Sequence, residues 1–179
     1  MRLFVAVEIA PDIRERLTHF MAERKLEMPN ARFVRPEGLH VTLKFLGEVA
    51  ETKLASLTTA LAEIHEDSFS LTLRGTGFFP NQKRPRIFWV GLHSDPEAAL
   101  SNLAASVDHA CAQLGFAPEE RPYQPHVTLA RLSNSRASPR ITDESFGMMW
   151  ATHFHLYQSQ LHPKGAIYTK LASFTLAHT

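Results

Sequence analysis

Two identical tetrapeptides, His-Val-Thr-Leu, begin at His40 and at His126 of this chain of 179 residues. Successive side chains of an extended strand point to opposite faces, so each copy places its His and Thr on one face and its Val and Leu on the other. If the two strands face one another, His40, Thr42, His126 and Thr128 line one cleft with approximate twofold symmetry. A single copy would fit an ordinary amphipathic strand, whereas the repetition indicates a shared site.

Two imidazoles and two hydroxyls in one cleft are suited to acid-base chemistry on a phosphate. Imidazole titrates near neutrality, so one His can accept a proton from a nucleophile while the other donates a proton to a leaving oxygen. The hydroxyls of Thr42 and Thr128 can donate hydrogen bonds to the non-bridging oxygens of the phosphoryl group. The residues alone fit either assignment of acid and base to the two histidines.

The composition is that of an ordinary globular protein, with 44% hydrophobic and 21% charged residues, and no apolar run approaches the length that spans a bilayer. We expect residues 1–179 to form a single domain made of two similar lobes that share the cleft. The chain reaches an acidic residue at Glu8, unlike a signal peptide, so we place the protein in the cytoplasm. The net charge of +1 gives no case for wrapping duplex nucleic acid, and any contact with RNA should be local.

Hydrophobic periodicity and turn residues predict an α+β fold. Helices are expected from Pro11 onward and over Glu51–His65 and Asp95–Leu114. Strands are expected at the second tetrapeptide and over Leu3–Ile9, His40–Leu46, Phe69–Arg74, Arg86–Leu92, Met148–Gln160 and Tyr168–Leu176. The strand over Phe69–Arg74 should pair in antiparallel fashion with that over Arg86–Leu92. The strand over Met148–Gln160 should pair in the same way with that over Tyr168–Leu176. Residues 133–145 should form a surface loop that could cover the cleft.

A basic segment between aromatic residues is a candidate contact for RNA. Lys83, Arg84 and Arg86 lie between Phe79 and Trp89, and this mixture of cations and rings could hold a phosphate backbone and stack a base. A solvated hairpin loop fits the same residues equally well.

No residue pattern predicts a metal or another cofactor. His153 and His155 form a His-x-His pair that could bind a metal from one strand face, but no carboxylate or cysteine lies at ligand spacing, and we expect both on the surface. The single cysteine, Cys111, can form no disulfide within the chain and should be a small core or surface residue rather than a catalytic thiol.

The segments around the two tetrapeptides, residues 39–48 and 125–131, resemble the two-histidine phosphoesterase superfamily, and within it the RNA 2′,3′-cyclic phosphodiesterases, also called 2′-5′ RNA ligases. The likeness runs from residues 2–6 through the strand at residues 86–91 to Tyr168. It implies a bilobal fold with antiparallel sheets and flanking helices around a water-filled cleft. It also implies metal-independent hydrolysis of a terminal 2′,3′-cyclic phosphate of RNA to a 2′-phosphate.

By this resemblance His40 is the proton donor to the departing 3′ oxygen, and His126 is the base that activates water. Thr42 and Thr128 would hold the phosphate, and Arg131 would add positive charge. Strict alternation places Arg131 on the face of the apolar side chains, so it reaches the cleft only if the strand twists or ends there.

The same alternation predicts the faces on which the two residues after the first tetrapeptide lie. Lys44 shares the parity of His40 and Thr42 and could contact substrate, although its counterpart in the second copy is an alanine. Phe45 has the opposite parity, so burial in the core is expected rather than stacking on a base; Tyr168 is a second candidate for stacking.

Two further functions remain open from the sequence. One is 2′-5′ ligation of RNA, which is the same chemistry in reverse with a 5′-hydroxyl in place of water. The other is a nucleotide-binding or RNA-end-binding module that uses the cleft without turnover. Because a binding module has no need for two acid-base groups, we favour the enzyme. Its expected partners are RNA 3′ ends or nucleotides with a 2′,3′-cyclic phosphate, and we expect a monomer.

Overall fold

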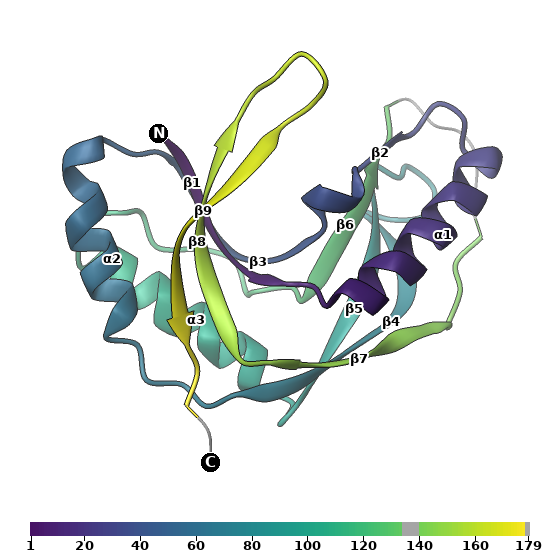
Figure 1. Ribbon diagram of the computed structural model, residues 1–179. Coiled ribbons are helices and arrows are strands. Elements are labelled where there is room, and N and C mark those ends of the chain that lie inside the picture. The colour runs from purple at the N-terminus through teal and green to yellow at the C-terminus, as the bar shows by residue number, and fades with distance from the viewer. Residues whose placement is uncertain (134–139, 178–179) are drawn as a thin grey trace.

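The computed structural model describes residues 1–133 and 140–177 of the chain. Two antiparallel sheets stand side by side in it, and helices cover their outer faces (Figure 1). This arrangement confirms the α+β fold with antiparallel sheets and flanking helices. None of the described helices has the length and apolar character needed to cross a membrane.

Each sheet combines strands from distant parts of the chain. Sheet A has the order β3 (His40–Glu48), β1 (Arg2–Glu8), β8 (His153–Gln160) and β9 (Ile167–Thr175). Sheet B has the order β2 (Arg32–Phe33), β6 (His126–Arg131), β5 (Ile87–Asp95), β4 (Phe69–Phe79) and β7 (Ser145–Ala151). All neighbouring strands are antiparallel, and the expected pairs β4–β5 and β8–β9 are among them.

The helices form the two outer layers. They are α1 (Pro11–Glu27), α2 (Leu54–Ala62) and α3 (Ala99–Ala112), with short 3₁₀ turns η1 (Pro36–Gly38) and η2 (Glu51–Lys53) before β3 and α2. On α1, the ring of Phe20 packs against Phe88 of β5 and Phe146 of β7, so α1 covers sheet B. The other two helices contact strands of sheet A, α3 through β3 and α2 through β9. Figure 1 accordingly shows α1 on one side of the molecule and α2 and α3 on the other.

Two expected helices begin or end differently. The helix expected over Glu51–His65 is a 3₁₀ turn followed by the shorter α2. The third helix begins at Ala99 rather than at Asp95, which closes strand β5 and provides no helix cap. Cys111 of α3 is fully buried, and burial raises the pKa of its thiol to about 11, in keeping with a core residue.

The prediction of a single strand over Met148–Gln160 is wrong. The chain forms β7 at the edge of sheet B, breaks at Thr152 and continues as β8 within sheet A. In the sequence the alternation continues across this break, through Met148, Trp150, Phe154 and Leu156, although the first two are exposed and the last two are buried. Periodicity reports which face of a strand is buried, but it carries no information on the sheet with which the strand pairs.

Strand β3 contains a β-bulge directly after the first His-x-Thr. In its pairing with β1, Thr42 lies opposite Ala6, whereas Lys44 lies opposite Val5, so Leu43 is an extra residue. A bulge sets two residues of one strand against one residue of its partner and thereby shifts the alternation. Both Leu43 and Lys44 are buried as a result.

Strand β6 contains the same bulge at the same place in the second copy. Thr128 lies opposite Trp89 of β5, whereas Ala130 lies opposite Phe88, so Leu129 is the extra residue. Leu129 and Ala130 are both buried. The two halves of the protein therefore repeat not only a tetrapeptide but also the irregularity that follows it.

The bulges correct two expectations from strict alternation. Lys44 was expected to face substrate, but its side chain is 3% exposed and its Nζ donates to Asp108 Oδ1 of α3 at 2.6 Å and to the carbonyl of Ala117 at 3.0 Å. Burial opposes the charge, but the hydrogen bond to Asp108 and the nearby Glu119 outweigh it, so the pKa of Lys44 is raised. Phe45 was expected in the core, but it is 70% exposed.

Replacing Lys44 with Ala should destabilise the fold. It leaves Asp108 without its buried partner, and we expect the free energy of unfolding in urea to fall by about 2 kcal/mol. This is less than the ~3–5 kcal/mol of a fully buried pair, because the Asp108 side chain is 25% exposed. Lys83→Ala, in an exposed loop, is the control and should stay within about 0.5 kcal/mol of the parent. Equal stability of the two variants would contradict a structural role for Lys44.

Candidate active site

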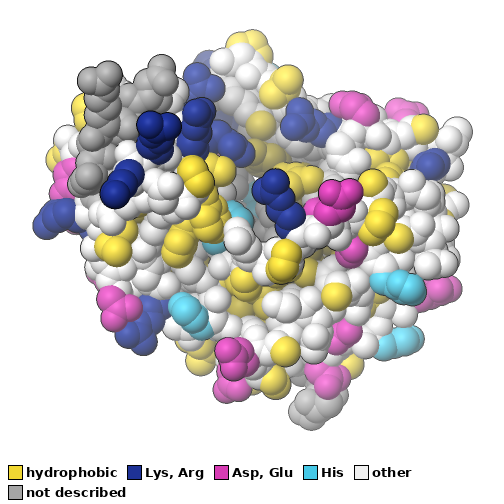
Figure 2. Space-filling view, turned by 180° about the vertical axis from the view of Figure 1, so that it is seen from behind, with side chains coloured by type: hydrophobic (Ala, Val, Ile, Leu, Met, Phe, Trp, Pro, Cys, Tyr) yellow, Lys and Arg dark blue, Asp and Glu magenta, His cyan; other side chains and the backbone are white. Residues whose placement is uncertain are grey.

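The two His-x-Thr strands lie next to one another where the sheets meet. Strand β3 is the edge of sheet A, and it contacts β6 of sheet B. The hydroxyl of Tyr123, three residues before the second His, donates a hydrogen bond of 2.7 Å to the carbonyl of Thr42. This hydrogen bond joins the segment that precedes β6 to the backbone of β3. Figure 2 shows one face of the molecule hollowed near its centre, with Lys and Arg side chains gathered around the hollow.

Both imidazoles are held in the same way. Nδ1 of His40 lies 3.1 Å from the carbonyl of Gly38, and Nδ1 of His126 lies 2.7 Å from the carbonyl of Gln124, in each case two residues earlier. A carbonyl oxygen only accepts, so Nδ1 carries the proton in both rings. Nε2 is then the atom of each ring that remains to accept or donate a proton.

His40 sits among aromatic rings. Its ring centroid lies 5.6 Å from that of Phe4, 4.7 Å from Tyr157 and 5.3 Å from Tyr168, with edge-to-face geometry. Burial lowers the pKa of His40 below its usual 6.5, with the Gly38 carbonyl opposing the shift. In the free protein at neutral pH, His40 is therefore mostly the neutral imidazole.

His126 has a different aromatic neighbour. Phe79, at the end of β4, is perpendicular to the His126 ring at a centroid distance of 5.0 Å, and it packs against Trp89 at 5.3 Å. The indole of Trp89 lies so close to Gly77 that a Cβ there would collide with it. The glycine thus allows Trp89 to lie flat on this face of sheet B, beside Thr128.

The remaining expected phosphate ligands lie on the same faces. Thr42 and Thr128 are partly exposed beside their histidines, in the pattern expected from alternation. Arg131 follows the bulge at Leu129 and therefore returns to the face of Thr128, which resolves the conflict with strict alternation. Arg131 is exposed, and within residues 1–133 and 140–177 its side chain makes no hydrogen bond or ion pair. Its guanidinium is available for an anion.

Sheet A contains a polar cluster that was not predicted from the sequence. Glu8, opposite His40 in the β1–β3 pairing, accepts a hydrogen bond of 3.0 Å from Lys170 and lies 3.8 Å from His155 Nε2. His155 is buried rather than on the surface as expected, its Nδ1 lies 2.9 Å from the Ser173 hydroxyl, and burial lowers its pKa to about 4. No sequence pattern joins these residues, because they come from three different strands.

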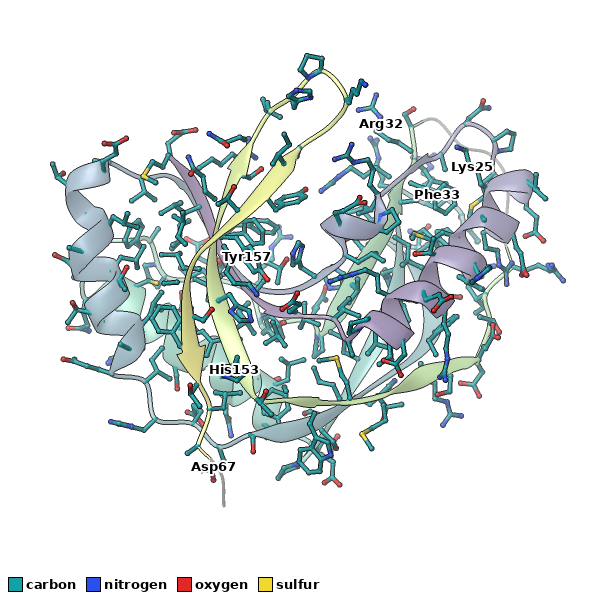
Figure 3. The ribbon with its side chains drawn as sticks, in the orientation of Figure 1. Lys25, Arg32, Phe33, Asp67, His153 and Tyr157 are labelled. Carbon is teal, nitrogen blue, oxygen red and sulfur yellow. The ribbon has the colours of Figure 1, made fainter. Side chains whose placement is uncertain are left out.

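His153 is exposed, as expected, and it stacks parallel to His155 with ring centroids 6.3 Å apart. Figure 3 shows Tyr157 and His153 on the same strand, with Tyr157 nearer the middle of the molecule. Among the described residues, no three His, Cys, Asp or Glu side chains are grouped so that they could hold a metal ion.

The basic segment is a hairpin loop between β4 and β5, which confirms that interpretation. The side-chain oxygen of Asn81 accepts hydrogen bonds from the backbone amides of Lys83 and Arg84, at 3.0 Å and 2.9 Å. The side chains of Lys83, Arg84 and Arg86 are exposed. Contact of this loop with RNA stays a prediction.

The loop expected over residues 133–145 is described in part, since residues 134–139 lie outside the described residues. Its second half is tied to the protein through Arg140, which binds Glu27 of α1 at 2.6 Å, and through Asp143, which binds Arg74 of β4 at 2.9 Å. A role in covering the cleft stays a prediction.

Comparison with known proteins identifies close relatives. The family model of LigT-like phosphoesterases matches residues 7–89 and again residues 90–168. The RNA 2′,3′-cyclic phosphodiesterase of Archaeoglobus fulgidus is 39% identical over 97% of this chain and 99% of its own length. That of Escherichia coli is 33% identical over 98% and 96%.

Solved structures agree with these matches. Escherichia coli LigT complexed with 3′-AMP superimposes with a TM-score of 0.85 at 31% identity, covering 98% of this chain and 97% of the other. A protein of Thermus thermophilus, TT0787, gives a TM-score of 0.84 at 31% identity, covering 98% of each chain. The resemblance stated from the two motifs is confirmed.

The aromatic surroundings of His40 should be visible in an NMR titration of the free protein. We expect His40 to protonate below pH 6.5 and to be the Nδ1–H tautomer when neutral, because burial disfavours the imidazolium and the Gly38 carbonyl holds the Nδ1 proton. Tyr168→Ala should open the ring cluster to water and move the titration of His40 upward. A His40 that titrates above pH 6.5 in the parent would contradict this environment.

The hydrogen bond from Tyr123 to Thr42 should stabilise the junction of the two strands. Tyr123→Phe leaves the carbonyl of Thr42 without this donor, and we expect a loss of about 1 kcal/mol in urea unfolding. Tyr168→Phe is a matched control, because the Tyr168 hydroxyl makes no hydrogen bond within the described residues. The same loss in both variants would show that the bond is not the cause.

Proposed function

Because this chain belongs to the LigT-like phosphoesterase family, we propose that it is an RNA 2′,3′-cyclic phosphodiesterase that forms a 2′-phosphate. The relatives that carry this name match nearly the whole chain. The observation that carries the proposal is the paired geometry of the site. Two imidazoles on equivalent strands are each held through Nδ1, so each presents Nε2 as a proton-transfer atom.

The proposed step is in-line displacement at phosphorus. Nε2 of His126 accepts a proton from water, the water oxygen bonds to phosphorus, and the bond from phosphorus to O3′ breaks. Nε2–H of His40 gives its proton to O3′, so that one base and one acid are enough for a strained cyclic diester. After the step His126 is protonated and His40 is neutral, and exchange of protons with solvent restores the starting state.

Thr42, Thr128 and Arg131 are the proposed phosphate ligands. The two hydroxyls donate to the non-bridging oxygens, and Arg131 supplies positive charge as the phosphorus gains a fifth oxygen. Arg131 suits this role because it is exposed on the face of Thr128 and has no ion-pair partner among the described residues. The proposed step uses no metal ion.

The acid role of His40 is compatible with its lowered pKa. An anionic substrate nearby favours the imidazolium, so binding of the cyclic phosphate raises the protonated fraction. An imidazolium packed among aromatic rings is then a stronger acid than an exposed one and gives up its proton more readily.

The same groups would catalyse 2′-5′ ligation in reverse, with a 5′-hydroxyl in place of water. Both histidines come from one copy of the chain, so the site needs no second copy, and we propose a monomer built as a single domain.

The roles of the two histidines are tested with a substrate in which sulfur replaces the bridging O3′. A thiolate leaves without protonation, so this substrate has no need of the acid. His40→Ala and His126→Ala should each lower hydrolysis of the ordinary RNA substrate by about 10²–10⁴-fold. The sulfur substrate should restore most of the rate of His40→Ala and little of the rate of His126→Ala.

The control is His65→Ala, an exposed His after α2, which should keep the parent rate. Rescue of His126→Ala instead of His40→Ala would exchange the two roles. Full activity of either variant on the ordinary substrate would overturn the two-histidine mechanism, and loss of the parent activity in EDTA would show that a metal takes part.

A further inference from the structure

A pair of arginines lies at the end of sheet B beside the site. In the β2–β6 pairing Arg32 is directly opposite Arg131, and Arg131 lies on the same face as Thr128. Residues directly opposite one another in a sheet point to the same side, so Arg32 faces the cleft as well. Adjacent strands are about 4.8 Å apart, so the two arginines are neighbours on one surface. Figure 3 shows Arg32 at the upper rim of the molecule.

No carboxylate of the described residues neutralises this pair. Arg32 and Arg131 are both exposed, and within residues 1–133 and 140–177 neither side chain makes a hydrogen bond or an ion pair. By contrast, Arg74 and Arg140 each bind a carboxylate. Like charges directly opposite one another disfavour the pairing of two strands, so folding alone gives no reason for this arrangement. Two free guanidinium groups at one end of a cleft suit phosphate groups.

The cleft face of the segment around β2 leads from Arg32 to the half of the site that contains His40. Val34 lies two residues after Arg32, and its backbone amide continues the pairing with β6. A Cβ on Gly38 would meet both Val34 and Tyr168, so these two side chains approach one another there. The ring of Tyr168 in turn lies 5.3 Å from that of His40. Arg32 is therefore on the side of the cleft towards His40.

We infer that Arg32 binds the phosphodiester on the 5′ side of the nucleotide that carries the cyclic phosphate, and that it thereby favours RNA chains over free nucleoside cyclic phosphates. The inference rests on the proposed function, in which Arg131 binds the reactive phosphate and His40 protonates O3′ of the ribose. The next anion along an RNA chain lies one ribose away from the reactive phosphate. Arg32 lies one strand away from Arg131, on the side of that ribose.

The test compares three substrates that differ in this second anion. They are uridine 2′,3′-cyclic phosphate, the dinucleotide UpU with a terminal 2′,3′-cyclic phosphate, and the same dinucleotide with a neutral methylphosphonate linkage. Both dinucleotides carry a 2′-O-methyl group on the first ribose, which keeps the linkage intact. The parent should prefer the anionic dinucleotide to the neutral one by about tenfold, the effect of one charge-assisted hydrogen bond.

Arg32→Ala should remove this preference. We expect kcat/KM for the anionic dinucleotide to fall about tenfold and kcat/KM for the other two substrates to change less than about twofold. Arg32→Lys should keep part of the preference, because it retains the charge without the planar guanidinium. Since Arg32 is exposed and has no partner among the described residues, these substitutions leave the core unchanged.

Lys53→Ala is the control, because it also removes one positive charge, from an exposed position in η2 at the start of α2. It should change kcat/KM for all three substrates less than about twofold. In Arg32→Ala, equal losses on the three substrates would place the contact at the reactive phosphate. Equal losses on the two dinucleotides would place it at the added nucleoside. Either result, or no loss at all, would overturn the inference.

Failure of the parent protein to hydrolyse any of the three substrates would instead overturn the proposed function. Calorimetric titration with the anionic dinucleotide that ends in a 2′-phosphate then still decides for Arg32. We expect binding about tenfold weaker in Arg32→Ala than in the parent and in Lys53→Ala. Equal affinities of Arg32→Ala and the parent would overturn the role of Arg32.

Discussion

The site depends on a β-bulge that follows each His-x-Thr. A strand that backs a polar face with a core must alternate strictly, and strict alternation would bury the third functional side chain. The extra residue, Leu43 in β3 and Leu129 in β6, keeps the apolar back continuous and returns the following side chains to the cleft. Phe45 and Arg131 thus join the histidines, whereas Lys44 enters the core and binds Asp108.

Symmetry of the backbone and asymmetry of the side chains together account for the chemistry. The two Nδ1–carbonyl hydrogen bonds give both imidazoles the same tautomer and direction, as a reaction with one proton transfer on each side of phosphorus requires. Their surroundings differ, because aromatic rings enclose His40 and lower its pKa. The proposed assignment of acid and base rests on the family resemblance, and the enclosure of His40 by aromatic rings is compatible with it.

The sequence predicted the features that arise from local pattern. The paired tetrapeptides identified both strands, and alternation placed His40, Thr42, His126 and Thr128 on the polar faces where they lie. Lys44 and Phe45 were misplaced because a bulge leaves no mark in hydrophobic alternation. The strand over Met148–Gln160 was not divided because pairing partners are non-local. The cluster of Glu8, His155 and Lys170 likewise exists only through pairing of distant strands.

The two-histidine mechanism is tested most directly by hydrolysis of a short RNA with a 2′,3′-cyclic phosphate in ¹⁸O-labelled water, followed by mass and positional analysis of the terminal phosphate. We expect a 2′-phosphate that contains one labelled oxygen, formed at the same rate with and without EDTA. A 3′-phosphate, or a product without label, would contradict attack by water with departure of O3′. Binding of the RNA end without any product would indicate a binding module in place of an enzyme.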